Sequence, residues 1–206
     1  MQAITDLIMY FHKGGLVMWP LLACSITVIA IAIERFIYYK SVDSGAVFAF
    51  RYCAAVRSGD FAVAKELARK GSGQCAQMLA DVEAVAGGKA EKSAFLESRA
   101  GIFMATLRDK LDYLGIIVTM SPLLGLLGTI VGMIGAFSIF NVEAGAPMAI
   151  TGGIGEALIA TATGLCVAIL SLCAHSYFAH RMDNMITDME QCFSALLEAE
   201  TRRGRS

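Results

Sequence analysis

Residues 152–164 read GGIGEALIATATG, and Glu156 is their only ionisable side chain. The surrounding segment 144–180 contains no other Asp, Glu, Lys or Arg residue, so it predicts a membrane-spanning helix. A charged side chain at the centre of such a helix costs about 3 kcal/mol on insertion scales, and it is by default functional, often part of an ion or proton path. The alternative is an interfacial Glu near the start of a helix, where the helix dipole favours a negative charge.

Two more segments, 14–33 and 113–142, contain no charged residue. Since about 20 apolar residues cross the hydrocarbon core, the sequence predicts an all-α membrane protein with three transmembrane helices. The second and third extend into a cytoplasmic helical domain. We divide the chain into an amphipathic periplasmic-surface helix (1–13), transmembrane helix 1 (14–35), a cytoplasmic helical domain (36–112), transmembrane helix 2 (113–142), a short periplasmic loop (143–147), transmembrane helix 3 (148–178) and a cytoplasmic C-terminal helix and tail (179–206).

Basic residues predict the orientation. Twelve of the 17 Lys and Arg residues lie between Arg35 and Lys110, four follow the third span, and the loop between the second and third spans has none. By the positive-inside rule, the C-terminus is expected to be cytoplasmic and the N-terminus to lie outside. Asp6 precedes the first span and no basic cluster does, so this span is expected to be a retained anchor rather than a signal peptide. The basic residues form no single cationic module, and we expect no nucleic-acid partner.

The cytoplasmic segments have a helical character. Turn residues at 58–60, 71–73 and 87–88 divide the first of them into short helices. From about Ala90 onward no helix breaker precedes the second span, so the sequence predicts one continuous helix entering the membrane. After the third span, apolar residues recur every three or four positions, as in an amphipathic helix.

The cysteines and histidines do not form a metal-site pattern. The six cysteines include no CxxC pair, and the cytoplasmic ones are expected to stay reduced. His175 and His180 are five residues apart, which does not place them on one helix face. We therefore expect no metal and no cofactor, and the sequence does not indicate an enzyme, because it offers no nucleophile–base pair or phosphate loop.

A stripe of small residues marks the second span. Gly125, Thr129, Gly132 and Ala136 follow one another at helical spacing, and small residues let helix backbones approach closely in lipid. The stripe serves either packing alone or the wall of a hydrated path. We assign Gly125, Gly132, Ala136 and, in the third span, Gly164 to helix packing in the pore wall.

Spacing also places three polar side chains at defined depths. Thr129 and Thr161 lie equally far from the centre of the outer loop, so two antiparallel helices bring their hydroxyls to similar depth, with Glu156 about 7–8 Å nearer the outside. We assign all three residues to a proton pathway. Glu156 and Thr161 are about 140° apart around an ideal helix. Either Glu156 faces a neighbouring subunit, or the helix turns irregularly through its glycines.

The chain resembles the ExbB/TolQ/MotA family of proton-channel subunits, most closely ExbB and next TolQ. The resemblance covers nearly the whole chain. It is carried by GGLVMWPL at 14–21 with Ser25 and Glu34-Arg35, by SPLLGLLGTIVG at 121–132, and in the third span by GIGEAL at 153–158, ATA at 160–162 and GL at 164–165. MotA is the more distant relative, because it has four spans and this chain shows three.

The resemblance implies a homo-oligomer, expected to be a pentamer, that encloses the single transmembrane helices of an ExbD- or TolR-like partner dimer. The partner supplies an intramembrane Asp, and Thr129, Glu156 and Thr161 match family positions around the proton path. It further implies contact with membrane lipid, use of proton-motive force for work on the envelope, and in ExbB systems a TonB-like protein.

Departures from the family pattern leave the branch open between ExbB and TolQ. Gly152 stands where Pro is frequent, Leu170 replaces another Pro, and His175-Ser176 replaces Tyr-Asn. Two other functions are also open: a self-contained channel or transporter gated by Glu156, and a structural scaffold in which the glycines serve packing only.

Overall fold

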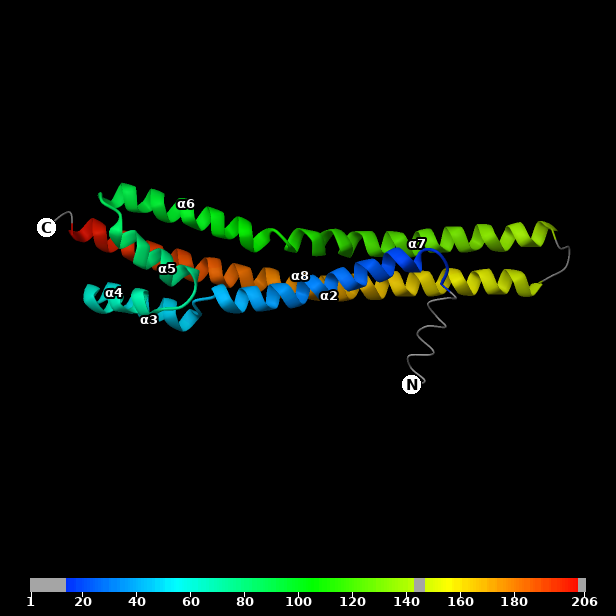
Figure 1. Cartoon of the computed structure of the whole chain (residues 1–206), viewed down its shortest axis with the longest axis horizontal. Coiled ribbons are helices and arrows are strands. Elements are labelled where there is room, and N and C mark those ends of the chain that lie inside the picture. The colour runs from blue at the N-terminus through cyan, green and yellow to red at the C-terminus, as the bar shows by residue number, and fades with distance from the viewer. Residues whose placement is uncertain (1–13, 143–146, 204–206) are drawn as a thin grey trace. The chain divides into compact units, whose positions relative to one another are not determined.

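The structure is a computed structural model that describes residues 14–142 and 147–203, with side chains for 14–138 and 152–202. The chain divides into two units. Figure 1 draws the helices of the whole chain. The membrane unit joins the chain up to Ile33 with Leu111–Ser176, and the extramembrane unit joins Glu34–Lys110 with the chain from Tyr177 onward. The expected amphipathic helix 1–13 and most of the loop 143–147 lie outside the described residues.

Helices make up both units, and no strand occurs in the described ranges. In chain order they are α2 (Met18–Val42), α3 (Ala46–Arg57), α4 (Phe61–Lys70), α5 (Gln74–Asp81), the 3-10 helix η1 (Val82–Ala84), α6 (Lys89–Arg108), α7 (Leu111–Val142) and α8 (Pro147–Arg203). Three stretches are long and apolar enough to cross a membrane, as predicted. The third span also continues without a break, because α8 runs for 57 residues.

The membrane unit is organised around a seam between α7 and α8, which lie side by side in Figure 1. A Cβ atom added to Gly132 would lie 3.2 Å from the carbonyl oxygen of Gly153, and one added to Gly164 would lie 2.5 Å from that of Ser121. The helix backbones therefore touch, as expected where small residues drive packing in lipid. Two hydroxyls reinforce the seam: Ser171 donates to the Leu114 carbonyl at 3.0 Å, and Thr161 donates to the Gly125 carbonyl at 3.0 Å.

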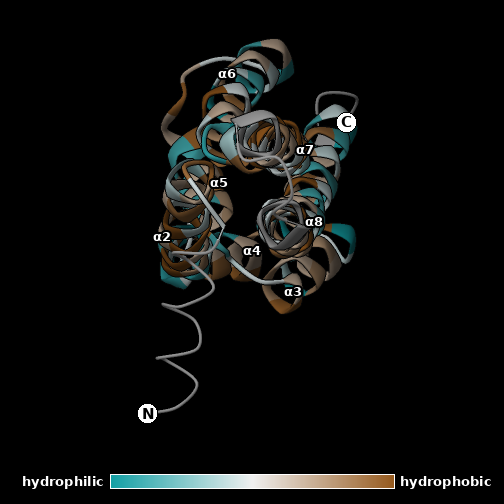
Figure 2. Ribbon diagram, turned by 90° about the vertical axis from the view of Figure 1, so that its right-hand side faces the viewer, coloured by the Kyte–Doolittle hydropathy of each residue, from teal (hydrophilic) through white to brown (hydrophobic). Residues whose placement is uncertain are grey.

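The outer faces of the membrane unit carry large exposed apolar side chains. They include Ile26, Ile29 and Ile33 of α2, Leu123, Leu126 and Ile134 of α7, and Leu165, Ile169 and Leu172 of α8. The hydrophobic colour along α2 is visible in Figure 2. Such a surface is unusual for a protein in water and normal for one in lipid.

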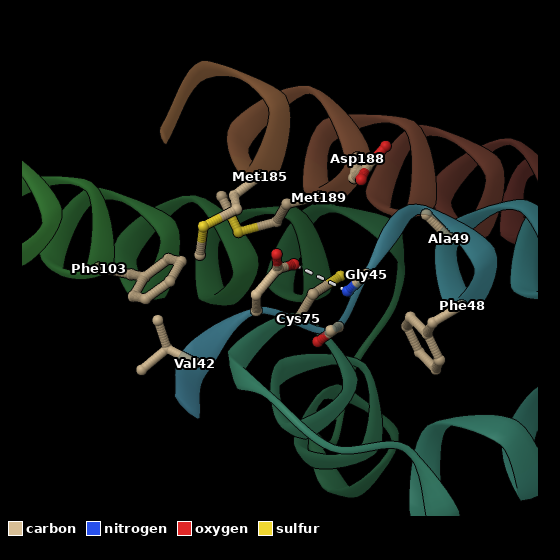
Figure 3. Close-up of a pocket in the computed structure, with 11 residues that line it drawn as sticks. Val42, Gly45, Phe48, Ala49, Cys75, Phe103, Met185, Asp188 and Met189 are labelled. Atoms are coloured by element: carbon tan, nitrogen blue, oxygen red, sulfur yellow. Dashed lines mark hydrogen bonds between the residues drawn. The ribbon is translucent and has the colours of Figure 1, made fainter. Parts of the chain in front are cut away.

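The extramembrane unit is built from bulkier residues. Its α6 buries Leu96, Ala100, Phe103 and Leu107, and its part of α8 buries Met182, Met185, Met189, Cys192, Phe193 and Leu196. Figure 3 shows Phe103, Cys75, Met185 and Met189 converging on a cavity of only about 10 Å³. A cavity of this size holds at most about one water molecule, so it is a packing defect rather than a ligand site.

The expected continuous helix into the second span is wrong in one detail: a two-residue turn at Asp109-Lys110 separates α6 from α7. Two side chains of α2 bind carbonyls of α6 just before this turn. Buried Arg35 donates to the carbonyls of Thr106 at 3.0 Å and Leu107 at 3.4 Å, and the Tyr39 hydroxyl donates to Leu107 at 3.0 Å. In an uninterrupted helix these carbonyls would accept from the amides four residues later, so the two side chains replace those backbone bonds.

Candidate functional site

Three helices meet at the start of α2. A Cβ atom added to Gly128 of α7 would lie 2.5 Å from the Cβ of Ala160 on α8 and 3.6 Å from the Cβ of Val17. Val17, Met18 and Leu21 form a buried cluster with Leu124 beside it. The first turn of α2 therefore packs against the seam between α7 and α8.

Glu156 points at this junction. A Cβ atom built on Gly15 would overlap Oε1 of Glu156, so the half-buried carboxyl rests directly against the turn that precedes α2. The sequence left two arrangements open, a neighbouring subunit or an irregular helix. The structure shows α8 helical without interruption through Gly152–Gly155, and the carboxyl facing the first span of its own chain.

The two threonines take different partners. Thr161 is half-buried and bonds across the seam to Gly125, whereas Thr129 donates to the carbonyl of Leu126 in its own helix at 2.6 Å. Because Gly128 lies opposite Ala160, Thr129 and Thr161 differ in depth by about 3 Å at 1.5 Å per residue. Glu156, Thr161 and Thr129 thus occupy neighbouring levels of one hairpin, each with its own contact.

The four residues assigned to packing all lie in the seam. Gly125, Gly132, Ala136 and Gly164 are buried. Gly125, Gly132 and Ala136 contact the backbone and small side chains of α8, and Gly164 contacts the backbone of α7. A hydrated path past these helices would therefore run beside the seam and not through it.

Sequence reasoning missed two residues of this site. Gly15 is one, and the signal for it was the Gly-Gly pair at the start of the first predicted span. Ser121 is the other: it is fully buried in the seam, and its Oγ has no hydrogen-bond partner among the described residues. A buried hydroxyl without a partner is costly in lipid. Ser121 lies between the two interhelical hydroxyl bonds of Ser171 and Thr161.

Charge in the site comes from Glu156 alone. The segments 14–33, 113–142 and 144–180 contribute no other Asp, Glu, Lys or Arg. Within the described ranges no three His, Cys, Asp or Glu side chains are placed to hold a metal ion. The chemistry that this arrangement offers is proton exchange at one carboxyl, with hydroxyls one or two helical turns away.

Comparison with known proteins agrees with this chemistry. The model of the MotA/TolQ/ExbB proton channel family matches residues 68–191, more than half of the chain. ExbB-like 1 of Synechocystis sp. is 34% identical over 170 residues, which cover 79% of this chain and 66% of that relative. ExbB-like 3 of the same organism is 31% identical over 164 residues, covering 77% of this chain and 78% of that relative.

A shorter match links the chain to the Tol-Pal system. TolQ of Pseudomonas aeruginosa is 36% identical over 81 residues, which cover 39% of this chain and 35% of that protein. The chain thus spans just under two thirds of the ExbB-like 1 length and about a third of TolQ. Because the family model covers more than half of the chain, the chain belongs to the MotA/TolQ/ExbB proton channel family.

Proposed function

We propose that this protein is the proton-conducting stator subunit of an ExbB–ExbD-like motor in the bacterial inner membrane. It converts proton-motive force into mechanical work on the envelope, such as TonB-dependent import. The observation that carries the proposal is the carboxyl of Glu156, the only charged group of its span, held half-buried where three helices meet. A carboxyl so placed is costly unless it serves an ion or proton path.

The chain needs a partner to do this work. In the proposed assembly several copies, expected to be five, surround a dimer of an ExbD- or TolR-like single-span protein whose intramembrane Asp exchanges protons. The N-terminus is periplasmic and the C-terminus cytoplasmic. Thr129 and Thr161 line the path with Glu156, and Gly125, Gly132, Ala136 and Gly164 hold its wall together. A TonB-like protein would receive the force.

The energetics support such a drive. One proton that crosses a potential of 100 mV releases about 2.3 kcal/mol, so a few protons per cycle are enough for a conformational step. Two conformations of a protein commonly differ by a few kcal/mol in free energy, so this energy is enough to shift the chain from one to the other.

The test is proton flux. The chain is reconstituted in liposomes with the Asp-bearing companion, and acidification is followed with a pH-sensitive dye. Glu156→Gln keeps the shape and removes the charge, so we expect flux to fall by about 100-fold, as for other positioned proton-transfer groups. Gly135→Ala is the control, because a Cβ there meets nothing within 4 Å. Unchanged flux in Glu156→Gln would favour the scaffold. Full flux without the companion would favour a self-contained channel.

A TolQ-like role in envelope integrity and cell constriction is the second candidate, favoured by the match to TolQ of Pseudomonas aeruginosa. Deletion of the gene separates the two roles. Loss of receptor-mediated uptake with an intact envelope supports the ExbB-like role, and leakage of periplasmic protein with chained cells supports the TolQ-like role.

A further inference from the structure

A side chain at position 15, in the turn before α2, would displace the carboxyl of Glu156. Gly15 adopts φ +71°, a backbone conformation that L-residues rarely take, and Oε1 of Glu156 fills the place of its missing Cβ. Either observation alone would favour glycine here. Together they indicate that the turn is shaped around the carboxyl.

A second contact fixes the same turn to α8. A Cβ atom on Gly14 would lie 2.5 Å from Cγ of Met18 and 3.3 Å from Cγ2 of Ile159. Ile159 lies three residues after Glu156, so both side chains leave the same face of α8. Gly14 and Gly15 therefore contact adjacent turns of one helix face.

Behind the turn, α2 is anchored by burial. Val17 and Met18 are 7% and 6% exposed and Leu21 is 1% exposed, whereas Leu16 and Trp19 on the other face are 80% and 62% exposed. The amide of Met18 donates to the Gly15 carbonyl at 3.2 Å, which closes the turn against the first helical residues. The turn is thus held from both sides, by α8 in front and by its own helix behind.

We propose that the Gly14-Gly15 turn of the first span is a positioning element for Glu156: it sets the rotamer and the accessibility of the carboxyl from the α2 side. The inference rests on the proposed function only where it concerns proton flux. Its geometric content, that residue 15 determines how the carboxyl is shielded, holds whatever the carboxyl does. The first span is accordingly part of the path's control and more than an anchor.

The test compares four forms of the full chain, reconstituted with the Asp-bearing companion: wild type, Gly15→Ala, Glu156→Asp and the double variant. Gly152→Ala is the matched control, since Gly152 has no positive φ and a Cβ there meets nothing within 4 Å. Gly15→Ala displaces the carboxyl and is expected to lower flux by about tenfold or more, as misplacement of a reacting group does. Asp is one methylene shorter, so the double variant should regain flux relative to Gly15→Ala.

The double variant separates a clash with the carboxyl from simple backbone strain. Strain at residue 15 does not depend on the side chain at 156, whereas the clash does, so the two substitutions must be non-additive. Equal loss of flux on Gly15→Ala with Glu or Asp at 156 would overturn the proposal. Thermal melting of each purified form identifies a variant that has lost its fold. Gly15→Asn then replaces Gly15→Ala, because Asn tolerates a positive φ and still carries a Cβ atom.

A labelling experiment tests the positioning without any flux. A hydrophobic carbodiimide forms a stable N-acylurea on accessible carboxyls within a membrane, and mass spectrometry locates it. Glu156 should label several-fold faster in Gly15→Ala than in wild type, and at the wild-type rate in Gly152→Ala. Equal labelling of Glu156 in all three would overturn the proposal. Faster labelling in a chain that conducts no protons would uphold it while refuting the proposed function.

Discussion

The two units of this protein solve the packing problem in opposite ways. In the membrane unit, α7 and α8 approach until backbone meets backbone, as at Gly132 and Gly153, and hydroxyls bond to carbonyls across the seam. In the extramembrane unit, the interior is filled by large side chains such as Leu107 and Met189, which are 0% and 1% exposed. The difference follows from the solvent. Lipid gives no hydrophobic drive between helices, so close contact must supply the stability, whereas in water burial of apolar area does so.

The largest effect should come from placing a larger side chain in the seam between α7 and α8. Gly164→Val adds atoms where a Cβ already lies 2.5 Å from the Ser121 carbonyl oxygen, and backbone on both sides cannot give way. We expect a loss of about 3 kcal/mol or more, seen as failure to recover folded protein from membranes. Gly152→Ala, in open space, should be recovered at wild-type level. Normal yield and melting temperature of Gly164→Val would show that the seam is looser than described.

The opposite change tests the extramembrane unit. Leu107→Ala empties a fully buried site, and such truncations cost about 2–5 kcal/mol. The expected result is a lower melting temperature of the detergent-solubilised chain. Ile102→Ala on the same helix removes a side chain that is 65% exposed, so it should change the melting temperature little. If both variants melt alike, burial does not stabilise this unit as we infer.

A smaller effect is expected where side chains interrupt a helix. Arg35→Met keeps the length of the buried side chain but removes its hydrogen bonds to Thr106 and Leu107. We expect the free energy of unfolding to fall by about 1–2 kcal/mol, because backbone hydrogen bonds partly replace the two charge-assisted ones. The freed Thr106 carbonyl can then accept from the Lys110 amide. Hydrogen exchange at that amide should become slower than in wild type. Faster or equal exchange would mean that Arg35 does not cause the turn.

The smallest effect concerns pH. Burial raises the pKa of the Cys53 thiol from 9.0 to about 11, and the Cys192 thiol lies 4.0 Å away. A thiol with a raised pKa favours the folded state fully below pH 9, and this contribution declines as the pH rises toward 11. Melting temperatures of the wild type should therefore fall between pH 9 and 11 more steeply than those of Cys53→Ala. Parallel curves for the two proteins would exclude the thiol as the cause.

Much of the fold could be predicted because hydropathy and small-residue spacing act locally. Three spans, the long α8 and the glycine stripe all follow from neighbouring residues. The turn at Asp109-Lys110 could not, because neither residue is a helix breaker, and Arg35, which binds the carbonyls before the turn, is more than 70 residues away. The surroundings of the Glu156 carboxyl could not be predicted for the same reason. Helical geometry fixed its angle from Thr161, but the contact that receives it comes from Gly15 at the other end of the chain.

The α7–α8 seam also determines how this gene can vary. Every missense change at a glycine codon adds at least a Cβ atom, and at Gly125, Gly132, Gly153 and Gly164 that atom would lie within about 3.2 Å of a neighbour. Leucine and methionine codons in the extramembrane unit, by contrast, have single-nucleotide neighbours of similar volume. A saturation-mutagenesis map should therefore show a narrow line of positions through the spans that accept only glycine, beside a domain whose buried positions accept other apolar side chains of similar volume.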